Sequence, residues 1–219
     1  MKTLISVDWD FFVPEDLAWD LGHQESLMFL KMMWMHRMNL QGKMVTNGIE
    51  KNFWKGASGK RILVSDSHAL VASALNEVDR VVLYDAHHDC WPAKEPGMVH
   101  CHDWGSAFIE CGGILEWVYP SKLPCEIPEG ITARKYDGHI EYGDAVHICR
   151  SGCWTPPWLD KAFIRFVRSA EKELGVKAEC LQDKEWNPMK GRFSKQDFNT
   201  AYKVQKDMKS LMNKNLRPC

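Results

Sequence analysis

The feature that most constrains this chain is a set of short apolar runs that end abruptly in aspartate or histidine. Each run has an apolar body of about four to six residues, the length typical of strands buried on both faces of a parallel sheet. Three of the runs lead into Asp8, Asp66 and Asp85. Six strands are therefore predicted, within residues 3–12, 61–68, 80–89, 113–120, 131–137 and 143–151.

Helical patterns alternate with these runs. Glycine or proline bounds several of them, as expected at helix ends. Helices are predicted over residues 25–40, 69–78, 104–111, 156–174 and 194–213. Alternating strands and helices indicate an α/β fold, a three-layer α/β/α sandwich with a mostly parallel sheet. The 219 residues are 45% hydrophobic and 26% charged, which is typical of one globular domain spanning residues 1–219.

Charge and cysteine content narrow the class of partner. A formal net charge of −1 does not indicate a partner, and the basic cluster from Lys203 to Arg217 is interpreted as the solvated face of a helix, so nucleic acid is not the expected partner. No apolar run approaches the ~20 residues that span a bilayer, and Asp8 and Asp10 interrupt the N-terminal run where a secretory signal would lie. The eight cysteines contain no CxxC pair. We therefore expect reduced thiols in a cytoplasmic protein that uses neither membrane nor nucleic acid.

Three acid- and histidine-bearing segments follow three of the predicted strands. They read Asp8-Trp9-Asp10, Asp66-Ser67-His68 and Asp85-Ala86-His87-His88-Asp89. In open α/β sheets, functional groups gather at the carboxyl ends of the strands. One such segment alone is typical of a cap or a turn, but the four carboxylates of Asp8, Asp10, Asp85 and Asp89, gathered in one place, would repel one another strongly unless cations held them. A pair of divalent cations is therefore predicted, with a metal centre built from Asp8, Asp10, His68, Asp85, His87 and Asp89.

These segments resemble motifs of the arginase and agmatinase (ureohydrolase) superfamily. DAHHD is similar to its D-A-H-x-D signature, SVDWDFF to its S-x-D-x-D segment, and SDSH in part to its histidine-bearing G-G-D-H segment. The order is circularly permuted relative to ordinary arginases, and the glycines of the third segment are absent. With its short length and its VDWDFF opening, the chain most resembles the peptide arginases of ribosomal peptide maturation. The resemblance covers about the first half of the chain and implies an arginase-like fold.

The resemblance also implies how the six side chains would divide between two manganese ions. One ion would take His68, Asp85, Asp89 and Asp8. The other would take His87, Asp85, Asp8 and Asp10. Hard carboxylates with one imidazole per ion suit Mn²⁺ better than zinc or copper. Two Mn²⁺ ions are accordingly the expected cofactors.

The activity implied is hydrolysis of the guanidinium group of arginine residues in a precursor peptide, which yields ornithine and urea. Asp89 is expected to accept a hydrogen bond from the nucleophile. His102, at a predicted helix start, is expected to supply a proton to the departing amine, with His100 as the alternative. His88 lies between two ligands and is expected to face away from the ions.

Substrate contacts are less constrained by the sequence. A guanidinium needs a carboxylate or carbonyl partner, and the sequence does not distinguish Asp66, Asp103, Glu110 and Asp160. Aromatic side chains that could line the entrance and stack on a guanidinium are Trp9, Trp104 and Trp154. Residues 150–156 lie between a predicted strand and a predicted helix and are expected to form an active-site loop.

Three other functions remain open at this point. The chain could be a ureohydrolase or amidohydrolase that acts on a free small molecule. It could also be a metal-binding module without turnover. A phosphoesterase with paired metals would need basic groups near the site, and Arg150 is the one obvious provider.

Overall fold

The computed structural model describes residues 1–13, 46–93, 97–121, 125–152, 154–155 and 159–181. The helices predicted over residues 25–40 and 194–213 lie outside these residues. Among the helices that are described, none has the length and apolar character needed to cross a bilayer.

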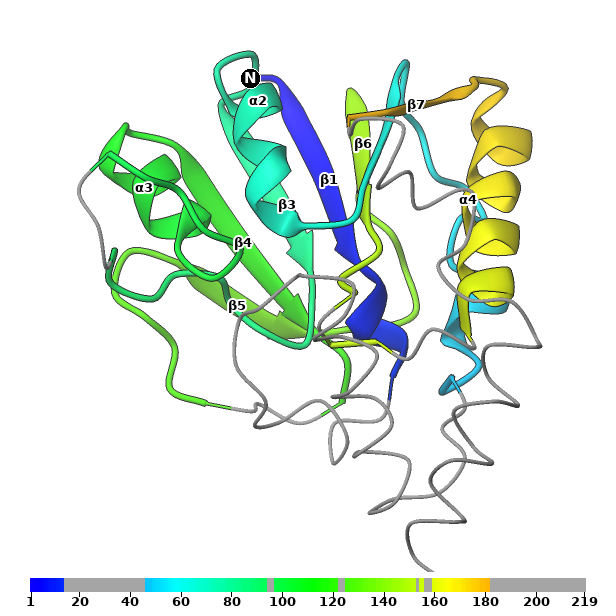
Figure 1. The fold of residues 1–219 in the computed structure, drawn as a ribbon, viewed down its shortest axis with the longest axis horizontal. Coiled ribbons are helices and arrows are strands. Elements are labelled where there is room, and N and C mark those ends of the chain that lie inside the picture. Colours follow the sequence, from blue (N-terminus) through cyan, green and yellow to red (C-terminus); the bar gives the residue numbers. More distant parts are fainter. Residues whose placement is uncertain (14–45, 94–96, 122–124, 153, 156–158, 182–219) are drawn as a thin grey trace, which may run out of the picture.

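A seven-stranded sheet forms the centre of the molecule (Figure 1), and every strand pair in it is parallel. The strands are β1 (Thr3–Asp8), β2 (Ile62–Ser65), β3 (Arg80–Tyr84), β4 (Ile114–Tyr119), β5 (Thr132–Lys135), β6 (Ala145–Cys149) and β7 (Ala178–Cys180). Their order is β5-β4-β3-β1-β6-β2-β7. The predicted α/β class is confirmed, and all six predicted strands are present.

Consecutive residues of the central strands enter different hydrophobic clusters, because side chains alternate between the two faces of a sheet. In β1, Leu4 belongs to one cluster and Ile5 to the other. In β3, Val81 and Val82 divide in the same way. Both faces are therefore covered, which explains why these strands read as nearly continuous apolar runs.

Two short helical segments cover one face. A 3₁₀ helix, η4 (His68–Val71), continues into α2 (Ala72–Leu75), and α3 (Trp104–Glu110) lies beside them. We predicted one helix over residues 69–78; the structure instead begins with a 3₁₀ turn and ends its α-helix three residues earlier. Gly105 allows close contact with the sheet layer, because a Cβ there would lie 2.6 Å from Cys90 Sγ and 2.8 Å from the Asp89 carbonyl oxygen.

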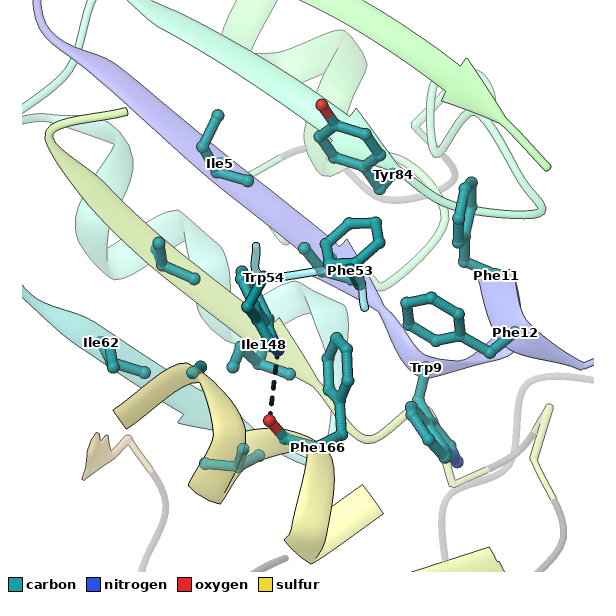
Figure 2. Close-up of a cluster of buried hydrophobic side chains, with 14 of the residues drawn as sticks. Ile5, Trp9, Phe11, Phe12, Phe53, Trp54, Ile62, Tyr84, Ile148 and Phe166 are labelled. Atoms are coloured by element: carbon teal, nitrogen blue, oxygen red, sulfur yellow. Dashed lines mark hydrogen bonds between the residues drawn. The ribbon is translucent and has the colours of Figure 1, made fainter. Parts of the chain in front are cut away.

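The other face is covered by α4 (Asp160–Leu174) and a cluster of aromatic side chains, shown in Figure 2. The 3₁₀ helix η1 (Trp9–Phe12) follows β1 directly and contributes rings to this cluster, and η3 (Ile49–Lys51) precedes Phe53 and Trp54. Phe166 of α4 lies 5.3 Å from Trp9 and 4.8 Å from Phe12, ring centroid to centroid. Its carbonyl oxygen accepts a hydrogen bond from Trp54 Nε1 at 3.2 Å.

The last two elements of the described chain, α4 and β7, differ in how well the sequence predicted them. The stop at Gly175 is confirmed: this glycine follows α4 with φ 69°, a left-handed conformation that glycine adopts at little cost. Strand β7 was not predicted. It has three residues, of which Glu179 is exposed, and so it lacks the apolar run that identified the other strands.

Candidate metal centre

The predicted ligands lie at the carboxyl edge of the sheet. Asp8 is the last residue of β1, Asp85 directly follows β3, and His68 begins η4 three residues after β2. Strand β1 pairs with β3 on one side and with β6 on the other, and β6 pairs with β2. Because all these strands are parallel, segments that are distant in sequence end side by side.

One pocket at this edge contains all six side chains that we predicted as ligands. Its lining consists of Asp8, Asp10, His68, Asp85, His87 and Asp89, with Ser67, Cys101, Ser151, Gly152 and Trp154. The four carboxylates are buried. The His87 side chain is 19% exposed, so it marks the side of the cluster nearest to solvent.

Three of the carboxylates are fixed by a backbone amide through one oxygen. The Oδ1 atom of Asp8 accepts from the Asp10 amide at 2.9 Å, and that of Asp85 accepts from the His87 amide at 2.7 Å. Oδ1 of Asp10 accepts from the Ala86 amide at 3.2 Å. In each case the other oxygen, Oδ2, lies within 3.2 Å of a histidine ring nitrogen. Local turns thus orient Asp8 and Asp85, and the loop after β3 orients Asp10.

Asp89 is fixed differently. Its backbone has φ 51°, an uncommon conformation for a residue with a side chain. Its carbonyl oxygen accepts from the Gly105 amide at 2.9 Å, and its Oδ2 accepts from Trp104 Nε1 at 2.7 Å. The start of α3 therefore holds both the backbone and the side chain of Asp89 against the pocket.

His68 lies where the carboxylates converge. Its Nδ1 is 3.2 Å from Asp8 Oδ2, 3.1 Å from Asp85 Oδ2 and 2.9 Å from Asp89 Oδ2. Despite these distances, neither His68 Nδ1 nor Asp85 Oδ2 has a hydrogen-bond partner among the described residues. Burying a polar atom without a partner costs free energy. A cation bound between these nitrogen and oxygen atoms would give each of them a partner.

The pKa shifts of Asp85 and His68 also indicate that the cluster requires positive charge. Burial, followed by repulsion from Asp10, Asp89 and Asp8, raises the pKa of Asp85 well above its usual range. Burial alone would lower the pKa of His68, but its carboxylate neighbours outweigh burial and raise that pKa well above the ordinary value. The cluster therefore attracts positive charge, which either protons or metal ions can supply.

The donor set fits divalent cations. Within the described part of the chain, possible ligand atoms that lie within 4.8 Å of one another form three groups: Asp10, Asp85 and His87; His68, Asp85 and Asp89; and Asp8, His68 and Cys149. The first two groups share Asp85, as expected for a carboxylate that bridges two ions. These buried clusters can hold metal, and Cys149 at the end of β6 is a neighbour that the sequence did not identify.

The two histidines expected near the ions but outside the ligand set differ in position. His88 is buried away from the pocket: its Nδ1 accepts from the Cys90 amide at 2.9 Å, and its ring lies 4.9 Å from that of Trp91. His102 is also buried, and it is not part of the pocket lining. Its neighbour Cys101 does line the pocket, so the loop that carries His102 borders the site.

The aromatic residues expected at the entrance require correction. Trp9 is fully buried in the aromatic cluster on the α4 face, 5.6 Å from Phe163. Trp104 is also fully buried, with its ring 5.0 Å from that of His68. Both side chains are packed into the core, and neither is among the described residues that line the pocket. Trp154 does line the pocket, and its ring lies 4.7 Å from that of His87.

The candidate guanidinium partners also lie outside the pocket lining. Asp66 and Asp103 are each 2% exposed, and Asp103 Oδ1 accepts from the His100 amide at 2.6 Å. Glu110 is exposed at the end of α3. Asp160 forms a buried ion pair with Arg150.

Arg150 anchors the loop that follows β6. It is 1% exposed and bonds to Asp160 at the start of α4 and to Thr155 within the loop. This loop brings Ser151, with φ 50°, and Gly152 to the pocket. Arg150 is therefore paired within its own loop and with α4, and it is not among the described residues that line the pocket.

Ser151 and Gly152 line the pocket and belong to the loop of residues 150–156 that was expected at the active site, whereas Ser67 and Cys101 were not predicted as lining residues. Each lies in a loop that directly follows a strand or precedes a helix beside a predicted ligand. That position was the available signal, but small side chains in such loops are also typical of ordinary turns.

Comparison with known proteins gives no relative from which a function could be carried over: no family model, no curated protein and no solved structure matches this chain. Functional inference therefore rests on the chemistry of the pocket and on the motif resemblance described above.

Proposed function

We propose that this protein is a manganese-dependent hydrolase that converts arginine residues of a precursor peptide to ornithine and urea. The observation that supports this proposal best is the convergence of four buried carboxylates and two imidazoles on one pocket, where His68 Nδ1 and Asp85 Oδ2 have no hydrogen-bond partner among the residues that the structure describes. The choice of reaction follows the motif resemblance. The choice of Mn²⁺ follows the hard, mostly oxygen donor set.

Two bound divalent ions would supply a water of lowered pKa as nucleophile. The chain's residues have separate tasks around it. Asp85 lies between the two ligand groups and would hold both ions, whereas Asp89 would accept a hydrogen bond from the nucleophile. His102 would return a proton to the departing amine from the loop beside Cys101. The overall step breaks the bond from the guanidinium carbon to the side-chain nitrogen and adds one water, so urea leaves and an amine remains.

The lining favours a cationic, planar substrate group over an anionic one. Among the described residues that line it, none is a lysine or arginine, the side chains that would bind a phosphate. Trp154 lies beside His87 at the more exposed side of the cluster, where its indole could stack on a guanidinium. A stack of this kind contributes about 0.5–2 kcal/mol.

The direct test is mass spectrometry of an arginine-containing precursor peptide incubated with the purified protein and MnCl₂. Hydrolysis replaces a CN₂H₂ unit by hydrogen, so each converted arginine loses about 42 daltons, and urea is released in equal amount. Asp85→Asn is expected to abolish both conversion and Mn²⁺ binding. His102→Gln is expected to lower the rate of conversion and to leave Mn²⁺ binding unchanged.

Asp79→Asn is the matched control, because Asp79 is an exposed aspartate that bonds to the Lys2 amide at the opposite end of β1. It should retain full activity. An unchanged peptide together with turnover of free agmatine or an acetylated amine would replace this proposal by a small-molecule hydrolase. Tight Mn²⁺ binding without turnover of any of these substrates would indicate a metal-binding module.

A further inference from the structure

Three polar side chains lie in a row beneath His68, in a part of the sheet that is otherwise apolar. They are Ser6 of β1, His147 of β6 and Ser65 of β2, and all three are fully buried. Ser6 and His147 are register partners on adjacent parallel strands, and β6 lies between β1 and β2. Burying three such groups costs free energy unless they bond to one another.

They do form one continuous chain of hydrogen bonds. His68 Nε2 lies 2.8 Å from Ser6 Oγ, and Ser6 Oγ lies 3.0 Å from His147 Nδ1. His147 Nε2 lies 2.9 Å from Ser65 Oγ. Ser65 Oγ donates to the carbonyl oxygen of Ser67 at 2.8 Å, so the chain returns to the residue that precedes His68.

The donor and acceptor of every hydrogen bond in this chain follow from its last bond, the one to the carbonyl oxygen of Ser67. A carbonyl oxygen only accepts, so the Ser65 hydroxyl uses its single proton there and must accept from His147 Nε2–H. The His147 ring is fully buried and bonds to two uncharged hydroxyls, and burial of this kind favours the neutral ring. A neutral ring that carries its proton on Nε2 has a lone pair on Nδ1.

The same logic continues to the metal centre. His147 Nδ1 accepts the proton of Ser6, so Ser6 Oγ must accept from His68 Nε2–H. In the deprotonated ring that metal binding requires, this leaves the lone pair of His68 on Nδ1, the atom that lies 2.9–3.2 Å from three carboxylate oxygens. A metal-binding histidine needs this arrangement, in which one nitrogen donates to a fixed acceptor and the other faces the ion.

We infer that His147 is a positioning residue for the metal centre: with Ser6 and Ser65 it fixes His68 in the Nε2–H tautomer and so directs the Nδ1 lone pair into the pocket. This inference rests on the proposed metal centre for its purpose. The relay itself is a property of the metal-free protein.

The relay is tested first without metal, by ¹⁵N NMR of the histidine-labelled protein at neutral pH. His147 is expected to show a protonated Nε2 and an unprotonated Nδ1. The opposite tautomer of His147 would overturn the relay whatever the protein does with metal.

The positioning role is tested by titrating Mn²⁺ and following the free ion by electron paramagnetic resonance. Ser6→Ala removes the acceptor of His68 Nε2–H and is expected to weaken Mn²⁺ binding ten- to a hundredfold, the usual effect of losing a hydrogen-bond partner of a ligand. His147→Phe should have a similar effect. His147→Asn, whose side-chain oxygen can still accept from Ser6, should recover most of the affinity.

Thr3→Val is the matched control, because Thr3 is a buried hydroxyl of the same strand at its other end. It should bind Mn²⁺ as the parent does. Unchanged affinity in Ser6→Ala, with a folded circular dichroism spectrum, would overturn the positioning role. A parent protein that binds no Mn²⁺ would overturn both the proposed function and the positioning role, whereas the tautomer measurement would still decide the relay.

Discussion

The two faces of the sheet use the same strands for different purposes. On the α4 face, β1, β2 and β6 contribute Ile5, Val64 and Ile148 to a cluster made largely of aromatic rings. On the α2–α3 face, the positions that alternate with these residues include Ser6 and His147, which belong to the hydrogen-bond relay. One face is therefore continuous hydrophobic core, and the other contains a polar row that leads to the pocket.

The difference shows how the fold accommodates a buried charged site. Gathering four carboxylates destabilises the metal-free protein, as the raised pKa of Asp85 indicates. The aromatic face offsets this cost with side chains that each bury a large apolar area, and their ring pairs add about 0.5–1.5 kcal/mol each. Stability and metal binding should consequently respond to substitutions on different faces.

Phe166→Ala is expected to have the largest effect on stability, because it removes a ring that packs against Trp9, Phe12 and Trp54. The free energy of unfolding should fall by about 3–5 kcal/mol. Mn²⁺ affinity of the folded protein should stay within about twofold, since each 1.4 kcal/mol corresponds to tenfold and no ligand contact is lost. Urea denaturation and Mn²⁺ titration measure the two quantities.

Arg165→Ala, at an exposed position of the same helix, is the control and should change neither stability nor affinity. A tenfold loss of affinity in Phe166→Ala would contradict the division between faces.

The stability gained from Mn²⁺ is expected to increase with pH. In the metal-free protein the pKa values of Asp85 and His68 are both raised, so protons on these groups stabilise the fold at low pH and their contribution is lost as pH rises through those values. Metal requires the deprotonated ligands and has the opposite dependence. Each proton displaced should strengthen Mn²⁺ binding by about 1.4 kcal/mol per pH unit. Thermal unfolding with and without excess MnCl₂ between about pH 6 and pH 8 measures this gain in stability.

The gain should vanish in Asp85→Asn. A gain that falls as pH rises would contradict the assignment of Asp85 and His68 as ligands.

Trp104→Phe should have the smallest of these effects, and it allows the most direct comparison of the two faces. It keeps a ring beside His68 but removes the Nε1–H that holds Asp89 Oδ2 at 2.7 Å. Mn²⁺ affinity is expected to fall about tenfold. Trp54→Phe makes the same chemical change on the α4 face, where Nε1 donates to the Phe166 carbonyl oxygen, and it should leave Mn²⁺ affinity unchanged. Equal effects of the two variants would show that the indole hydrogen bond to Asp89 has no special role.

The strands were predictable because burial on both faces leaves a continuous apolar run in the sequence. Strand β7 was missed for the same reason: it lies at the edge of the sheet, where Glu179 faces solvent. The helix after His68 was predicted too long, because the apolar spacing of residues 69–78 does not reveal the tight 3₁₀ turn that brings His68 back toward the strands.

The six pocket side chains were predictable because they follow strands in motifs dense with ionisable groups. The relay was not. Ser6, Ser65 and His147 lie inside apolar runs, where a single serine or histidine gives no indication of its partner across the sheet. Trp9 and Trp104 were assigned to the entrance because they neighbour ligands in sequence, yet adjacent residues of a turn point in different directions.

The left-handed backbone of Asp89 restricts how this pocket can be altered. With φ 51°, the position accommodates asparagine or glycine readily, whereas branched and bulky residues would be strained there. Asparagine would keep the shape and lose the charge, and glutamate would keep a charge but strain the chain. Laboratory evolution of new substrate preferences should therefore find few solutions at position 89 and more at Ser67, Cys101 and Trp154, which line the same pocket without this restraint.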